Sequence, residues 1–259
     1  MTGITDWASK LQHACADIET NHLDFIVDQC GINFSIIPAL RDFSPPLKWQ
    51  SLYQGLPEEM LQEEAPLLVR ITLDDPLQRE WFVELAQTAK ETAPLLAICS
   101  LWPFTALAKW LTDCIDATHE ERAGLFRYFD TRIFPFLFSD ILTPEQQAQL
   151  QRPALFWSWL DRDDRLVLLS GNGSQPRKKE KCQKIALSDD QFEALMCICD
   201  VKLFLRHRDI PDAWFTSREE QFLACFKATL SATEKGILLD KEREEWVINT
   251  LAERHRIKA

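Results

Sequence analysis

The sequence predicts an α/β protein with a mixed sheet core, flanking helices and a helical C-terminal lobe. Short apolar runs alternate with helix-period patterns through about residue 150, which is typical of strands and helices layered in one domain. A polar stretch with several basic residues then interrupts the chain, and the pattern beyond it is almost wholly helical. We therefore expect an α/β domain at 1–170, a basic polar linker at 171–186 and a helical C-terminal region at 187–259.

The first part of the chain supplies one helix and several strands. Apolar residues recur every three or four positions over 6–20, which predicts an amphipathic helix. These residues are Trp7, Leu11, Cys15 and Ile18. Apolar runs bounded by turn residues predict strands at 23–27, 33–37, 49–53 and 67–73.

Local signals indicate where the following helices begin. Asp75 is a capping residue followed by Pro76, so we expect a helix from there to about residue 92. Its apolar face should carry Leu77, Trp81, Leu85 and Thr88. Capping boxes at Thr143/Gln146, Ser188/Gln191 and Ser217/Glu220 predict helices at 143–150, 188–207 and 217–235. The remaining expected elements are strands at 94–101, 124–129, 154–160 and 165–169, and helices at 103–116, 132–142 and 240–255.

Composition and charge narrow the range of partners. The chain has 259 residues, of which 46% are hydrophobic, so it can bury a sizeable core. Its net charge of -11 argues against general nucleic-acid binding, which needs a basic face. The longest apolar run, 93–107, is broken by polar residues and prolines and is too short to cross a membrane. Residues 1–10 do not resemble a secretory signal, so we expect a cytoplasmic protein with no membrane partner.

Sequence patterns of catalysis, cofactor binding and metal binding are missing. The chain has seven glycines and its one Gly-x-Gly is at 171–173, so we expect no nucleotide-binding loop. Cys197 and Cys199 lie about 200° apart on a helix, so one metal ion does not easily reach both. The eight cysteines are best explained as small buried residues in a reducing cytosol. A catalytic site assembled from distant residues stays open as an alternative.

A basic cluster stands out in the polar stretch. Its members are Arg177, Lys178, Lys179, Lys181 and Lys184. The cluster is either a solvated loop or an electrostatic contact with an acidic partner. We name Lys178 and Lys179 as candidate partner-binding residues.

The segment 125–138 combines aromatic and charged residues at high density. Its aromatic residues are Phe126, Tyr128, Phe129, Phe134, Phe136 and Phe138. Arg127, Asp130 and Arg132 lie among them. The aromatic residues predict a buried strand that turns into an apolar helix, whereas the charged residues either pair with one another or face a partner. The candidate partner-binding residues here are Arg127, Tyr128, Asp130, Arg132, Phe134 and Phe136.

The same segment carries a resemblance to a known family. Residues 126–133, FRYFDTRI, resemble the "FRFYDPRVL" segment of the type VI secretion effector-chaperone family, although Thr131 replaces the proline. Residues 51–55, SLYQG, resemble its "SLFEG" element, and residues 64–69, EAPLLV, resemble its "APYLV" element. The resemblance extends over about residues 20–255, with its specific part at 51–160.

The resemblance implies a non-catalytic adaptor without a cofactor. Members of that family bind the N-terminal region of an effector and the C-terminal end of the VgrG spike, and they load the effector onto the spike. Two alternatives remain at this stage, an enzyme with an unrecognised active site and an immunity protein that binds a toxin.

Overall fold

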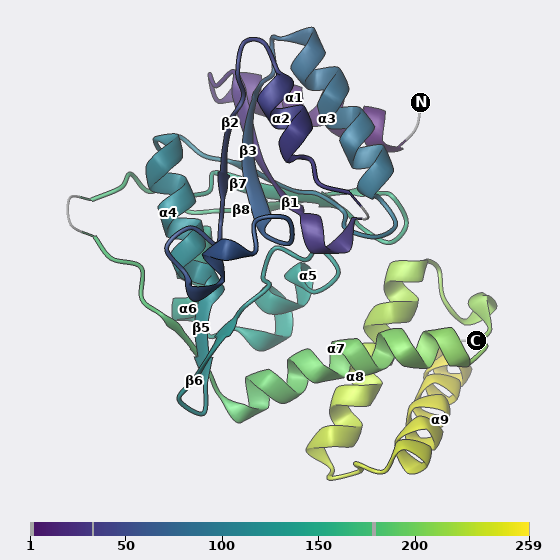
Figure 1. Cartoon of the computed structure of the whole chain (residues 1–259). Coiled ribbons are helices and arrows are strands. Elements are labelled where there is room, and N and C mark those ends of the chain that lie inside the picture. Colours follow the sequence, from purple (N-terminus) through teal and green to yellow (C-terminus); the bar gives the residue numbers. More distant parts are fainter. Residues whose placement is uncertain (1–2, 33, 178–179, 259) are drawn as a thin grey trace. The chain divides into compact units, whose positions relative to one another are not determined.

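The computed structural model describes residues 3–32, 34–177 and 180–258, and the chain divides into two units, Met1–Ala186 and Leu187–Ala259 (Figure 1). A six-stranded sheet with the order β2-β3-β1-β4-β7-β8 organises the first unit. Every neighbouring pair in it is antiparallel. The strands are β1 (His22–Asp28), β2 (Lys48–Ser51), β3 (Pro66–Thr72), β4 (Leu96–Cys99), β7 (Phe156–Leu160) and β8 (Leu166–Ser170).

The α/β class with flanking helices and a helical C-terminal region is confirmed, and the sheet is antiparallel where the sequence pattern predicted a mixed one. Strands β3 and β4 pair with opposite edges of β1, and helix α3 (Pro76–Ala89) connects them. They therefore run parallel to each other without being neighbours. An alternation of strand and helix along the chain thus arises here without any parallel pair in the sheet.

Helices α1 (Gly3–Asp17) and α3 cover one face of the sheet. Trp7, Leu11 and Cys15 of α1 are buried, as the helical spacing predicted. The indole nitrogen of Trp7 donates to Ser158 Oγ on β7 at 2.9 Å. Phe82 of α3 lies 5.0 Å, between ring centroids, from Phe25 of β1. Phe25 and Ser158 share this face because both align with Ala97 of β4.

Helix α3 begins as predicted but buries a different face. Asp75 accepts hydrogen bonds from the backbone N–H groups of Leu77 and Gln78. Leu77 is 56% exposed, and Thr88 is exposed as well. The predicted face was therefore wrong in part, because the helix is rotated about its axis. The buried residues are Gln78, Phe82, Leu85, Ala86 and Ala89.

The opposite face of the sheet is covered by α4 (Phe104–Ile115) and the chain that follows it. A second, three-stranded sheet has the order β6-β5-β9. Its strands are β5 (Asp116–His119), β6 (Arg122–Leu125) and β9 (Ile185–Leu187). Strands β5 and β6 follow α4 directly, and β9 comes later, after β8. After β6 come α5 (Phe134–Phe136), a single π-helical turn (Leu137–Ile141) and α6 (Pro144–Gln151). The Thr143/Gln146 capping box of α6 is confirmed.

Two predicted strands were wrong. The structure has no strand at 34–37, and helix α2 (Ile37–Asp42) begins there, with Pro38 in its first turn. The strand predicted at 124–129 ends at Leu125, and the chain continues in turns to Ile133. Ile36 and Ile37 are buried at the start of a helix, and Phe126, Tyr128 and Phe129 are buried in turns, so burial did not require a strand.

The described part of the second unit contains three α-helices and a 3-10 turn, Asp212–Trp214. The α-helices are α7 (Asp189–His207), α8 (Arg218–Glu234) and α9 (Asp240–Lys258). The Ser188/Gln191 capping box is confirmed, and the Ser217 side chain caps α8. Cys197 is buried and Cys199 is exposed, which agrees with their expected positions on different sides of α7. The predicted boundaries at residues 170 and 186 remain predictions.

Candidate partner-binding site

The segment 126–133 is a chain of turns between β6 and α5. Phe126 continues from β6 by donating its N–H to the Ile115 carbonyl at 2.8 Å. The N–H of Asp130 donates to the Arg127 carbonyl at 3.1 Å, and the N–H of Phe134 donates to the Asp130 carbonyl at 2.9 Å. These bonds turn the backbone twice within eight residues. They allow aromatic side chains to point inward while charged side chains reach the surface.

Three of the predicted partner-binding residues are core residues in the structure. Tyr128 and Phe134 are fully buried, and Phe136 is 2% exposed. The Phe134 ring lies 5.3 Å from Trp157 and 5.2 Å from Trp159, measured between centroids. The Tyr128 hydroxyl donates to the Leu111 carbonyl of α4 at 3.2 Å. These aromatic side chains join α4 and α5 to β7.

Four charged side chains form what we call the Asp–Arg cluster: Asp28, Arg127, Asp130 and Arg132. Arg132 binds Asp130 through two parallel hydrogen bonds, Nε to Oδ1 at 2.7 Å and Nη2 to Oδ2 at 2.6 Å. Arg127 forms an ion pair with Asp28, at the end of β1, and its guanidinium lies 5.3 Å from the Phe129 ring centroid. The side chains of Arg127 and Arg132 are 36% and 32% exposed, so the guanidinium groups mark the solvent side of the cluster.

The two carboxylates of the cluster have opposite pKa shifts. Burial raises the pKa of Asp28, and this effect outweighs the attraction of Arg127. Burial also acts to raise the pKa of Asp130, but the hydrogen bonds and positive charge of Arg132 prevail and leave that pKa below its ordinary value. Asp130 and Arg132 therefore form a stable charged pair, whereas Asp28 depends on Arg127 to remain ionised.

A third arginine lies beside the cluster. The Arg162 Nη2 donates to the Arg132 carbonyl at 2.9 Å, and its guanidinium lies 5.7 Å from the Phe136 ring centroid. Arg162 belongs to the turn between β7 and β8, so a second element supports the segment. Sequence reasoning missed both Arg162 and Asp28 because each is far from the segment along the chain.

The other predicted basic residues fall in the polar stretch. Lys178 and Lys179 lie outside the described residues. Nearby, Lys184 pairs with Asp116 of β5 at 2.6 Å, and Glu180 binds Arg152 through two hydrogen bonds of 2.6 and 2.7 Å. Lys184 is therefore held against β5, and Glu180, an acidic residue between the basic ones, is held by Arg152 at the end of α6.

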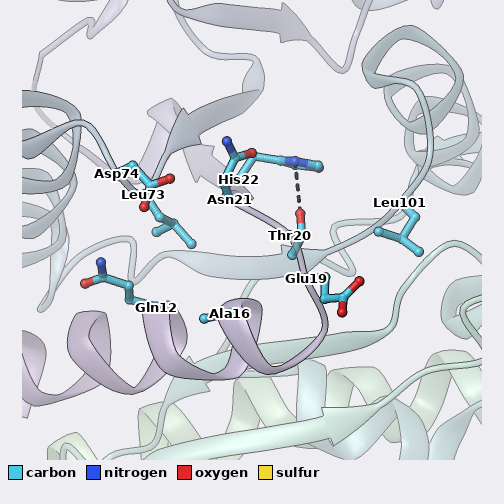
Figure 2. Close-up of a pocket in the computed structure, with 9 residues that line it drawn as sticks. All are labelled: Gln12, Ala16, Glu19, Thr20, Asn21, His22, Leu73, Asp74 and Leu101. Atoms are coloured by element: carbon cyan, nitrogen blue, oxygen red, sulfur yellow. Dashed lines mark hydrogen bonds between the residues drawn. The ribbon is translucent and has the colours of Figure 1, made fainter.

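An open hollow of about 640 Å³ lies at the start of β1, between the end of α1 and the chain after β3 (Figure 2). Its lining includes Glu19, Thr20, His22 and Asp74. His22 Nδ1 lies 3.1 Å from the Thr20 hydroxyl, and Nε2 lies 3.1 Å from the Ser100 carbonyl oxygen. Burial lowers the pKa of His22, and the charge of Arg70 lowers it further. Both ring nitrogens are thus engaged in supporting the strand, and we assign the hollow no reaction.

No group of three or more His, Cys, Asp or Glu side chains in 3–32, 34–177 and 180–258 is placed to hold a metal ion. Over the same described ranges, none of the helices is long and apolar enough to cross a membrane.

Comparison with known proteins identifies a family. Residues 25–149 match the family described as "Domain of unknown function (DUF4123)". The match runs from β1 to α6 and includes every member of the Asp–Arg cluster. No curated protein and no solved structure matches the chain. Over residues 25–149 the chain therefore belongs to the DUF4123 family, the family of type VI secretion effector adaptors.

Proposed function

We propose that the protein is a non-catalytic type VI secretion adaptor that loads an effector onto the spike. It binds the N-terminal region of the effector and the C-terminal end of VgrG. The observation that carries the proposal is the DUF4123 match over residues 25–149. The chemistry of the described residues supports binding, since the largely buried carboxylates of the Asp–Arg cluster orient two guanidinium groups that are partly exposed to solvent.

The Asp–Arg cluster is the surface that we assign to a partner. Arginine guanidinium groups bind carboxylates and carbonyls in a fixed, planar geometry, which favours specific recognition. Arg127 and Arg132 are held in place, Arg127 by Asp28 and the Phe129 ring and Arg132 by Asp130. A guanidinium that is already oriented loses less side-chain entropy when a partner binds. The backbone that carries these arginines is fixed by three buried side chains, those of Tyr128, Phe134 and Phe136.

The proposal is tested by capturing partners with the tagged protein from its native cells. We expect the wild-type protein to recover a VgrG spike and an effector, identified by mass spectrometry, and its deletion to abolish delivery of that effector. Arg132→Ala should recover at least about fivefold less of one partner, which corresponds to about 1 kcal/mol. Lys109→Ala removes an exposed charge from α4, whose pair with Asp113 is local, and it should behave as wild type.

Thermal melting of each variant separates a lost contact from a lost fold. Recovery of neither partner from cells with a working secretion system would contradict the adaptor function. Normal partner capture by Arg132→Ala would leave the adaptor function in place and would move the partner surface away from the Asp–Arg cluster.

A further inference from the structure

The two edge strands of the six-stranded sheet, β2 and β8, differ in how well they are shielded from pairing with another strand. Edge strands present unpaired backbone groups, and proteins commonly shield them with prolines or charges. The β2 edge has both, since Lys48 opens the strand and Pro45 and Pro46 precede it. The β8 edge, LVLLS at 166–170, has no charge and no proline, and none of its five side chains is buried. Leu168, at its centre, is 49% exposed.

The pairing of β8 with β7 determines which backbone N–H and C=O groups of β8 point away from the sheet. The Asp161 N–H donates to the Arg165 carbonyl, and the Gly171 N–H donates to the Leu155 carbonyl, both at 2.9 Å. Hydrogen-bonded pairs alternate along an antiparallel ladder, so Val167 and Leu169 direct their N–H and C=O groups at β7. Leu166, Leu168 and Ser170 therefore direct theirs away from the sheet.

We propose that this edge pairs with the β8 edge of a second copy of the chain. Two identical edges extend a sheet by antiparallel pairing about a two-fold axis. With Leu168 opposite Leu168 at the axis, Leu166 of each copy lies opposite Ser170 of the other. This register uses all three outward-facing residues in reciprocal pairs. A shift of the axis to Val167 or Leu169 leaves one of the three opposite a residue outside the strand.

The distribution of charges avoids repulsion between two copies in this register. The turn at 161–165 carries five charged residues and lies at one end of β8, and the stretch at 171–175 is uncharged and lies at the other. Antiparallel pairing brings the charged turn of one copy beside the uncharged stretch of the other, so like charges do not meet. The Leu168 side chains come together at the axis and lose water-exposed surface. Because the β2 edge is protected, the pairing closes at two copies.

The test is sedimentation velocity of the full chain over a wide range of concentrations. Wild type should pass from monomer to dimer as the concentration rises. Leu168→Lys and Leu168→Glu each place like charges opposite one another at the axis, and each should raise the dimer Kd at least about tenfold. An equimolar mixture of the two variants should dimerise again, because opposite charges then meet. Leu77→Lys changes an equally exposed leucine on α3 and should dimerise as wild type.

Hydrogen exchange of the wild type provides a second measurement that depends on no variant. The amides of Leu166, Leu168 and Ser170 should become protected as the concentration rises. A wild type that stays monomeric at every concentration overturns the proposal. So does a dimer that forms without protection of these amides or that Leu168→Lys leaves intact.

Discussion

At the scale of single residues, Arg70 and Asp24 form a buried ion pair between neighbouring strands. They lie directly opposite each other on β3 and β1, and Arg70 donates to both carboxylate oxygens at 2.8 and 2.7 Å. The Asp24 side chain is fully buried, and that of Arg70 is 13% exposed. Burial raises the pKa of Asp24 despite the hydrogen bonds from Arg70, so the carboxylate depends on its partner to stay charged.

Arg70→Met should therefore lower the free energy of unfolding by about 3 kcal/mol, because it leaves a buried carboxylate without a counter-charge. The double variant Arg70→Met/Asp24→Leu should recover most of this loss, since two apolar side chains can replace a buried ion pair. Urea denaturation of the single and double variants measures both values. If Arg70→Met is as stable as wild type, the Asp24–Arg70 pair does not contribute to the free energy of unfolding.

Two substitutions of Tyr128 test whether its side chain is a core residue or a partner contact. Tyr128→Phe removes the hydrogen bond to the Leu111 carbonyl and should cost about 1 kcal/mol, whereas Tyr128→Ala should cost about 3–5 kcal/mol because it opens a cavity. Partner capture by Tyr128→Phe should equal that of wild type because the hydroxyl is buried. Reduced capture by a fully folded Tyr128→Phe would return Tyr128 to the partner surface.

The lowered pKa of His22 predicts a pH dependence of stability. Between the folded-state pKa and the unfolded value of about 6.5, the unfolded chain binds more protons at this site than the folded chain. The contribution of His22 to stability is therefore complete above that range and is lost as the pH falls through it. Asp24 and Asp28, whose pKa values are raised, act in the opposite direction when they become protonated.

Comparing urea midpoints of wild type and His22→Gln at pH 7.5 and pH 5 isolates the imidazole, and wild type should lose more stability on acidification. Equal losses would contradict the prediction.

At the scale of elements, the sequence predicted best where the signal is local. The caps at Asp75, Thr143 and Ser188 are confirmed because a capping side chain reaches only two or three residues along its own helix. The face of α3 was predicted less well, since which side is buried depends on how α1 and β1 pack against it. The strand predicted at 33–37 is wrong over residues 34–37, and the one predicted at 124–129 is wrong beyond Leu125, because apolar composition reports burial rather than backbone conformation.

The prediction at the scale of elements concerns Asp75, which caps the N-terminus of α3. Its carboxylate accepts hydrogen bonds from two backbone N–H groups at 3.0 and 3.3 Å and from the Gln78 side chain at 2.9 Å. Asp75→Ala should cost about 1–2 kcal/mol, and Asp75→Asn, which can still cap, should cost less than half of that. Thermal or urea unfolding of the two variants checks the order. A loss from Asp75→Asn as large as that from Asp75→Ala would assign the effect to charge rather than to capping.

At the scale of the whole molecule, the candidate site depends on residues that are distant in sequence. The segment 126–133 was found from its composition, but Asp28, which pairs with Arg127 from 99 residues away, was not. The Arg127–Asp28 ion pair places the end of β1 beside the turns after β6, a contact between two sheets that the sequence pattern does not report. Sequence reasoning therefore named the charged residues Arg127, Asp130 and Arg132, which remain candidates for partner binding, and could not predict that Tyr128, Phe134 and Phe136 are buried.

The polar stretch after β8 belongs to the first unit, and Arg152 holds it. Besides the paired bonds to Glu180, Arg152 donates to the Gln175 carbonyl at 3.0 Å, and its guanidinium lies 5.9 Å from the Trp102 ring centroid. The hydrogen bonds from Arg152 lower the pKa of Glu180, so the pair remains charged near neutral pH.

Arg152→Ala should release this stretch without unfolding the sheet, because the contacts it removes belong to a segment of irregular backbone. Trypsin cleaves where the chain opens, and a local loss of about 1 kcal/mol should speed cleavage between residues 177 and 184 about fivefold. Peptide mapping over time measures the rate at each site. Arg122→Ala, on the exposed strand β6, is the matched control and should cleave as wild type. Equal rates in wild type and Arg152→Ala would show that other contacts hold the stretch, whereas faster cleavage throughout the chain would mean that Arg152 stabilises the first unit as a whole.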